Sequence, residues 1–306
     1  MIPASAVLAV LGAALFFAVA DICVKKALPF TTLITASLVT VAVQWLLYTA
    51  VILAAGTFSQ MNPAGVIWFA VTGVLNPVLF LVFYLIGFQR IGVARSAPLK
   101  GISPVFAVVC AFLFLGERLE VGQYLGIAMA IGGIGIISTE GWVKPSGETD
   151  PSGFSRVQGV SRPRKIDYLF PILAGATTGV SSVMLKIGLS KMPSPLLAAW
   201  IGVTVALVLL PLLAFIFPPG ERFGLRAPGL PWLLLGAVAA TVAVYALYLA
   251  LNLGQVSVVT TLNQTSPLFV LILSVLFIRQ LERVTLRVVV GAILTVGGGI
   301  LASVIH

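Results

Sequence analysis

Long runs of apolar residues alternate with short polar joints along the whole chain. Ten apolar windows follow one another, at residues 7–24, 33–55, 66–88, 93–115, 121–138, 169–189, 196–217, 232–252, 256–278 and 288–304. A transmembrane helix needs about 20 predominantly apolar residues. The joints hold the Gly, Pro and charged residues that a bilayer interior disfavours, as at 58–63 and 218–222. The pattern predicts an all-α integral membrane protein with ten transmembrane helices.

One joint is much longer than the others. Residues 139–167 are rich in Gly, Ser, Pro and Arg, a composition typical of a flexible, solvated linker. This basic linker separates residues 1–138 from residues 168–306, and each part holds five windows. The chain therefore divides into two units of equal helix number.

The two units repeat each other in sequence. An offset of 163 places Leu99, Ser103, Pro104, Phe106, Leu113 and Phe114 on identical residues at Leu262, Ser266, Pro267, Phe269, Leu276 and Phe277. Offsets of 164 and 161 pair Trp68 and Tyr84 with Trp232 and Tyr248, and Lys25 with Lys186. Because five is odd, the second unit is predicted to lie inverted relative to the first. Inverted repeats are the architecture of many secondary transporters, with the substrate site near the midplane.

These motifs resemble those of the drug/metabolite transporter superfamily, and more closely its EamA-type members. The resemblance rests on the duplicated Leu-x-x-x-Ser-Pro-x-Phe pattern, on the lysine that closes the first helix of each half, and on residues 116–119, Gly-Glu-Arg-Leu. It implies ten helices and carriage of small organic metabolites, often amino acids or sugar derivatives. The chain departs from a perfect repeat at Glu117, which has no counterpart at Gln280, although Glu282 is nearby.

The composition supports the prediction of a membrane protein and limits the classes of molecule that it is expected to bind. The chain is 59% hydrophobic and 9% charged, and its mean hydropathy is +1.13, whereas about a quarter of the residues of a soluble protein are charged. The net charge of +9 comes without a basic patch interleaved with aromatic residues. We therefore expect a lipid bilayer and a small-molecule substrate as partners, no nucleic acid, and a monomer or a homodimer as the assembly.

The distribution of basic residues bears on orientation. Fourteen of the 18 Lys and Arg residues fall in the odd-numbered joints and two in the even-numbered ones. Basic joints stay in the cytoplasm, so this count places both termini outside. The family resemblance implies cytoplasmic termini, and the two expectations stand against each other.

Lys100 lies about eight residues inside the fourth window, too deep for easy contact with the nearer interface. Its repeat mate is Asn263, followed by Gln264, and a proline comes four residues later in both windows. A charged residue within a span is a functional candidate because its insertion is costly. We predict that Lys100, Asn263 and Gln264 line a polar cavity where Lys100 binds a carboxylate or phosphate. In the alternative, Lys100 reaches the headgroups and the amides only join helices.

Asp21 is the only acidic residue inside a window, and Lys25 lies one turn further on the same face. Asp21 and Lys25 are therefore candidates for coupling transport to a proton or a cation. The competing interpretation is an interfacial salt bridge of little energetic weight. Lys186, the repeat mate of Lys25, has Ser182 in place of the acid.

Three further polar residues in the windows are substrate-binding candidates. Asn76 precedes Pro77 within the third window, where it either shapes a cavity or fits helices together. Tyr84 and Tyr248 occupy equivalent positions and either line a pathway or sit in the interfacial belt.

Together these features favour a secondary transporter that moves an amino acid or a related small organic solute by alternating access. The chain has no phosphate-binding loop for a built-in ATP motor. A channel or a lipid scramblase is the alternative. An intramembrane enzyme fits least, because the sole histidine is His306 and no two aspartates lie in the windows. We expect no catalytic residues, no cofactor and no metal site, and a multi-pass protein of the cell membrane whose first window is a retained helix.

Overall fold

A computed structural model describes residues 3–91, 99, 101–140, 164–215 and 223–277, together with 290, 291, 293, 294, 297, 298 and 301. Within these residues every regular element is a helix, and one isolated β-bridge joins Thr31 to Leu225. Lys100 and residues 141–163 of the predicted linker lie outside the described residues. The domain boundaries drawn from the sequence therefore stay a prediction.

The helices follow the apolar windows closely. The first half contains α1 (Ala4–Ala27), α2 (Leu33–Ala55), α3 (Pro63–Gly73), η3 (Val74–Leu79), α4 (Phe80–Ile91), α6 (Ser103–Cys110), η4 (Ala111–Leu115) and α7 (Val121–Glu140). The second half contains η5 (Lys165–Tyr168), α8 (Leu169–Lys191), α9 (Pro195–Ala214), η6 (Ala227–Gly229), α11 (Leu230–Leu253), α12 (Val256–Asn263) and α13 (Ser266–Phe277). Short η1 (Leu28–Phe30) and η2 (Thr57–Gln60) follow α1 and α2.

Six helical stretches among the described residues are long and apolar enough to cross a membrane. They are Ala4–Phe30, Leu33–Ala55, Pro63–Gly87, Lys165–Lys191, Pro195–Leu212 and Ala227–Leu253, and Ser103–Leu115 and Val121–Gly133 are shorter apolar helices. The helical membrane character predicted from the windows agrees with this result. The count of ten spans stays a prediction.

Local sequence signals set the helix ends. Thr32 precedes α2, and its hydroxyl oxygen accepts the N–H of Thr35 at 3.2 Å. Asn62 precedes α3, and its side-chain Oδ1 atom accepts the N–H of Ala64 at 3.0 Å, with proline at the first helical position. Such side chains replace the partners that the first N–H groups of a helix lack. Gly56 ends α2 at φ 64°, a left-handed conformation that glycine adopts without steric cost.

The ninth window, continuous in sequence, is divided in the structure. A turn at Gln264 and Thr265 separates α12 from α13, directly before the Ser-Pro of the repeated motif. A proline has no N–H to donate and disfavours helical geometry in the preceding residue. A turn at Gly101 and Ile102 precedes the same motif in the first half. The two halves thus interrupt a helix at corresponding positions.

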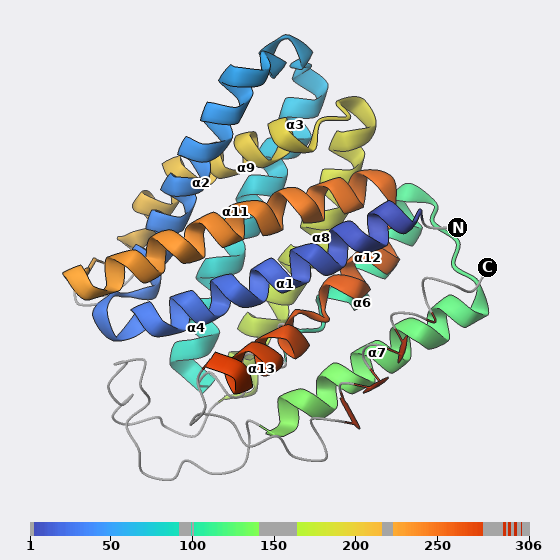
Figure 1. Ribbon diagram of the computed structural model, residues 1–306. Helices are drawn as coiled ribbons and strands as arrows, with labels where there is room; N and C mark the ends of the chain where they lie inside the picture. The colour runs from blue at the N-terminus through green and yellow to red at the C-terminus, as the bar shows by residue number, and fades with distance from the viewer. Residues whose placement is uncertain are drawn as a thin grey trace.

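The helix packing also follows the repeat. In Figure 1, α1 and α11 lie side by side, and α8 packs on α3 and α4 in the corresponding way. α1 and α11 are antiparallel, because Cys23 lies against Gly236 while Ala27 lies against Gly229, just before α11. α8 is antiparallel to α3 and α4, because Gly188 lies against Phe69 while Pro171 lies against Gly87. α2 packs on α9, and Gly73 of α3 approaches Gly202 of α9 so closely that an added Cβ would lie 2.6 Å from the Gly202 carbonyl oxygen. Contacts between the halves therefore build one continuous body.

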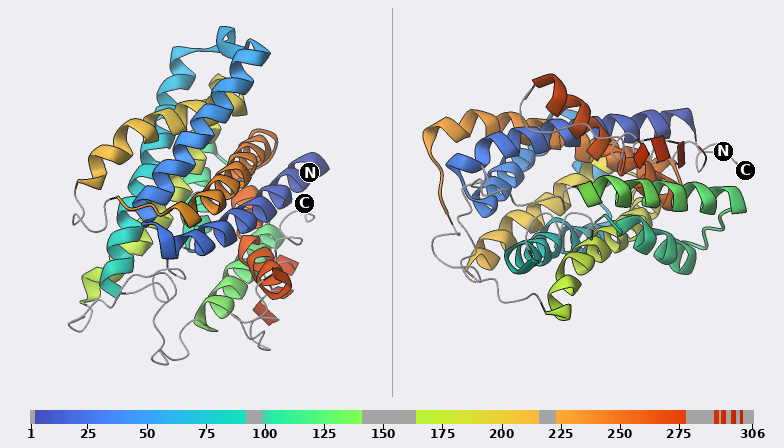
Figure 2. Two further views of the ribbon diagram at one scale, coloured as in Figure 1. Left: turned by 60° about the vertical axis from the view of Figure 1, so that its left-hand side comes forward. Right: turned by 90° about the horizontal axis from the view of Figure 1, so that it is seen from below.

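Helix α7 lies at the edge of this body, away from α2, α3 and α9 (Figure 2). Gly298, from the last predicted span, packs against the backbone of α7 at Gly126 and Ala130. Small residues permit such close backbone approach. Gly298 of the final window thus lies against α7.

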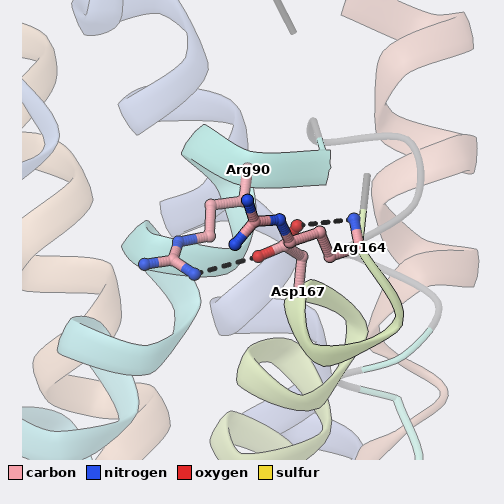
Figure 3. A network of polar contacts seen from close by, with 3 residues as sticks. All are labelled: Arg90, Arg164 and Asp167. Carbon is pink, nitrogen blue, oxygen red and sulfur yellow. Dashed lines mark hydrogen bonds and ion pairs between the residues drawn. The ribbon is translucent and has the colours of Figure 1, made fainter. Parts of the chain in front are cut away.

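An ion pair joins the end of α4 to the start of the second half. Nη1 of Arg90 donates to Oδ1 of Asp167 at 2.9 Å, and Oδ2 of Asp167 accepts the backbone N–H of Arg164 at 2.8 Å (Figure 3). The Arg90 guanidinium also lies 4.7 Å from the ring centre of Phe170. This network holds η5, at the start of the second half, against the end of α4.

Candidate functional site

A cavity of about 480 Å³ lies between the two halves. Helices α1, α2, α8, α9, α11 and α12 contribute to its wall, with η3 and the first residues of α6 and α13. Its polar side chains are Asp21, Ser37, Thr40, Gln44, Asn76, Ser103, Thr178, Ser181, Ser182, Tyr248, Thr260, Asn263, Gln264 and Ser266. So many hydroxyl and amide groups inside an apolar bundle mark a site for a polar ligand.

The interrupted helices meet at this cavity. Asn76 has non-helical backbone angles (φ −144°, ψ 118°) within η3, and it lines the wall together with Pro77. Gln264, in the turn between α12 and α13, lines it as well. Irregular backbone at membrane depth is tolerated where it borders a polar cavity or is buried in protein. The helix breaks therefore form part of the cavity wall.

A hydrogen bond connects the two corresponding breaks. Nε2 of Gln264 donates to the carbonyl oxygen of Gly101 at 3.1 Å. Gly101 and Gln264 are themselves repeat mates at the offset of 163. Equivalent positions of the two halves thus touch at the centre of the molecule.

A second amide connects η3 to α8. Nδ2 of Asn76 donates to the hydroxyl oxygen of Thr178 at 3.3 Å, and the Thr178 hydroxyl donates to the carbonyl oxygen of Ala174 at 3.1 Å. The Asn76 break is therefore held against the hydroxyl-bearing face of α8.

Several wall hydroxyls donate their proton to their own helix. Thr40 donates to Ala36, Ser182 to Thr178 and Thr260 to Val256, at 2.8, 3.1 and 2.8 Å. A hydroxyl oxygen retains acceptor capacity after its proton is donated. The wall consequently offers hydrogen-bond acceptors to a bound molecule.

Asn263 adds an acceptor without a partner among the described residues. Its Oδ1 atom is buried and accepts no hydrogen bond within the described part of the chain. A buried polar atom without a partner costs free energy. A ligand that donates a hydrogen bond at this point of the wall would remove that cost.

The two ends of the cavity differ. At one end the wall reaches Leu185 and Leu251, each 1% exposed and part of the main apolar core. We call this the α11–α12 end. At the opposite end it reaches Val24 of α1 and Leu33 of α2, beside Asp21, which is exposed. Among the described residues, this α1–α2 end therefore includes an exposed wall residue, whereas packing buries the wall at the α11–α12 end.

The structure brings five of the predicted site residues together at the cavity wall, namely Asp21, Asn76, Tyr248, Asn263 and Gln264. Tyr84 is half-buried and stacks on Phe80, a wall residue, with ring centres 5.6 Å apart. Lys25 is exposed one turn beyond Asp21. Lys100 lies outside the described residues, one position before Gly101. The roles assigned to these residues remain predictions.

Sequence reasoning missed a polar stripe on α2. Ser37, Thr40 and Gln44 line the cavity from one face of an otherwise apolar helix. Their spacing of three and then four residues is the signal that identifies such a face. Sequence reasoning also gave no partners to Lys186 and Glu117, whose side chains form hydrogen bonds at the end of α11 and the start of α12. In the described part of the chain, no three His, Cys, Asp or Glu side chains gather to hold a metal ion.

A polar cavity between two repeated sets of apolar, interrupted helices defines the class of the protein as a multi-pass helical membrane protein with a central polar cavity. Comparison with known proteins then places it in a family. The EamA-like transporter family pattern matches residues 4–139 and again residues 165–304. The chain belongs to this family, whose members are transporters and not enzymes.

Two individual proteins are similar to the chain. The uncharacterized transporter YcbK of Bacillus subtilis (strain 168) is 40% identical over 58 residues, a stretch that spans 19% of each protein. A protein of known crystal structure aligns over 98% of this chain and 97% of its own, with a TM-score of 0.76 and 18% identity. The second likeness shows the fold alone.

Proposed function

We propose that this protein is a secondary transporter of the cell membrane that carries a small organic solute by alternating access between its two halves. The observation that carries the proposal is the polar cavity at the helix breaks, which we interpret as open at the α1–α2 end and closed at the α11–α12 end. A carrier needs a central site that faces one side of the membrane at a time. Inverted repeats supply the second state by exchanging the conformations of the two halves.

The wall chemistry favours a solute rich in hydrogen-bond donors. The hydroxyl oxygens of α2, α8 and α12, the Oδ1 atom of Asn263 and the carboxylate of Asp21 are all acceptors. An amino acid or a related amine has the N–H donors that these acceptors need. A volume near 480 Å³ accommodates a molecule of that size. Lys100, next to the Gly101 break, is our proposed partner for the solute's carboxylate.

Asp21 is the proposed coupling residue. It is an exposed acid at the open end of the cavity, one turn before Lys25. In that position its carboxylate can exchange a proton or a cation with the solution and with the cavity.

Two measurements test the proposal. A thermal-unfolding screen of the purified protein against amino acids, amines, sugars, nucleosides and organic acids identifies a ligand, since binding to the folded state raises its stability. The ligand is then used in proteoliposomes, where we expect saturable uptake and counterflow. A channel or scramblase passes solute without counterflow, so non-saturable flux without exchange would refute the carrier assignment.

A further inference from the structure

Lys186 holds the end of a neighbouring helix. Its Nζ donates to the carbonyl oxygens of Leu251, Asn252 and Gly254 at 2.7, 3.2 and 2.9 Å. An ammonium group has three N–H donors, and each has an acceptor here. The last carbonyls of a helix lack intrahelical partners and form the negative end of its dipole. Lys186 thus caps the carboxyl end of α11 with a positive charge.

Glu117 holds the start of the next helix. Oε1 accepts the N–H of Val256 at 2.8 Å, and Oε2 accepts the N–H and the hydroxyl of Ser257 at 3.2 and 2.8 Å. These residues begin α12, where N–H groups are unpaired and the helix dipole is positive. A carboxylate from the first half therefore caps the amino end of α12.

The two caps act on one connection. Gly254 and Gln255 link α11 to α12, so a cation from α8 and an anion from the loop after η4 hold this link on both sides. Glu117 belongs to the first half and α12 to the second. The contact consequently joins the two halves, which must separate here if this end is to open.

This connection lies directly behind the closed end of the cavity. Leu251 lines the cavity with its side chain and gives its carbonyl oxygen to Lys186. Leu185, the neighbour of Lys186 in α8, lines the same end, and both leucines are 1% exposed. A shift of the α11–α12 connection away from Lys186 would move this apolar closure with it.

The open end carries the repeat mate of Lys186. Lys25 lies at the end of α1, is exposed, and follows the wall residues Asp21 and Val24. At the offset of 164, Leu251 and Gly254 correspond to Gly87 and Arg90 at the end of α4. If the two halves exchange conformations, the carbonyl oxygens at the end of α4 are the acceptors for Lys25 that correspond to those of Lys186.

We propose that Lys186 and Glu117 form a lock that closes the α11–α12 end, and that Lys25 closes the α1–α2 end in the alternate state. The inference rests on the proposed alternating access, and it adds the residues that hold each end. Because the acceptors of Lys186 are neutral carbonyls, water can replace them when the end opens.

The test measures access to the cavity from each face of the membrane. In a background with Cys23→Ala and Cys110→Ala, a single cysteine is placed on the wall by Ser182→Cys. Right-side-out and inside-out vesicles are treated with a membrane-impermeant thiol reagent, and the ratio of the two labelling rates is recorded. We expect Lys186→Met to raise labelling from the α11–α12 face relative to the other face by at least tenfold. Lys25→Met should shift the ratio in the opposite direction.

Lys191→Met is the matched control, because Lys191 is the exposed last residue of the same helix. Glu117→Gln keeps the side-chain shape and should move the ratio in the same direction as Lys186→Met, so it carries the test if Lys186→Met does not fold. A ratio unchanged within twofold in a folded Lys186 or Glu117 variant overturns the lock. The lock is also overturned if Lys186→Met and Lys25→Met shift the ratio of labelling rates in the same direction.

Labelling needs no solute, so the lock and the transport assignment fail separately. A ratio that responds while no solute shows counterflow upholds the lock and removes the carrier assignment. If the parent protein shows counterflow but the labelling ratio does not change in the variants, the carrier assignment stands and the lock is overturned.

Discussion

Asn263 places its side-chain Oδ1 atom, which has no partner among the described residues, at the wall of the central cavity. Asn263→Leu removes this oxygen and leaves a side chain of similar volume. We expect weaker solute binding by about 1 kcal/mol or more, roughly a fivefold or larger rise in Kd. The free energy of unfolding without solute should stay equal or increase, because an unsatisfied buried group is lost. Thermal unfolding with and without solute measures both quantities.

Gln60→Leu, at an exposed amide in η2, serves as the control. If the solute-induced stabilisation of Asn263→Leu equals that of the parent protein, Asn263 does not bind the solute.

Asp21 leads to a prediction about coupling. Asp21→Asn removes the only charge among the described wall residues and retains the side-chain shape. We expect uptake driven by an imposed proton or cation gradient to fall at least tenfold while counterflow persists, because exchange needs no net ion movement. Glu120→Gln, at an exposed acid of the loop before α7, should change neither rate. Gradient-driven uptake that survives Asp21→Asn would assign coupling to another group.

The polar residues of the site were predictable from sequence to different degrees. Asn263 and Gln264 stood out because amides are rare inside apolar windows and the repeat aligned Asn263 with Lys100. Ser37 and Thr40 did not, since hydroxyls are common in membrane helices and only their common face distinguishes them. The partners of Lys186 were not predictable at all, because backbone carbonyls carry no sequence signal.

At the scale of elements, the contact between α6 and α8 depends on Gly179. An added Cβ there would lie 2.5 Å from the carbonyl oxygen of Ser103 and 2.8 Å from the N–H nitrogen of Ala107. Gly179→Ala should lower the free energy of unfolding by about 1–3 kcal/mol. Backbone atoms cannot rotate away, so the overlap outweighs the gain of about 1 kcal/mol in helix propensity. Thermal unfolding in detergent provides the measurement.

Gly12→Ala is the paired variant, since an added Cβ on Gly12 of α1 meets nothing within 4 Å. It should leave stability unchanged or raise it. Equal effects of the two substitutions would show that α6 and α8 separate more easily than their packing indicates.

The helices themselves followed from their apolar windows, and α2 matches its window at both ends. The turn inside the ninth window was harder to predict. Pro267 signals a weakened helix, but the turn at Gln264 is also held by its bond to Gly101, 163 residues earlier. Such a partner is fixed only by the tertiary fold.

At the scale of the molecule, the charge count leads to a prediction about orientation. With fourteen basic residues in odd joints against two in even ones, we expect the carboxyl end to lie outside the cell. A reporter that fluoresces only in the cytoplasm, fused after His306, should therefore stay dark, while a periplasmic or extracellular reporter is active. Cytoplasmic fluorescence would instead agree with the orientation that the family resemblance implies.

The repeat predicted that two similar units build the molecule, and the packing of α1 on α11 and of α8 on α3 and α4 follows that repeat. The state of the molecule was not predictable. Nearly equivalent halves do not indicate which end of the cavity is closed. In the proposed lock that choice depends on small differences such as Glu117, which the second half does not repeat at Gln280.

The bond between Gln264 and Gly101 bears on how such a molecule arose. If the two halves descend by gene duplication from one five-helix ancestor that paired with a second copy of itself, these positions were once a single residue facing its own twin. Two identical side chains would compete for the same space at that point. On that view, fusion into one chain freed the two positions to differ, so that one is now a glycine and the other a glutamine whose side chain donates to the glycine's carbonyl oxygen. Joining the genes would thereby have released this central contact from the requirement that both partners be the same residue.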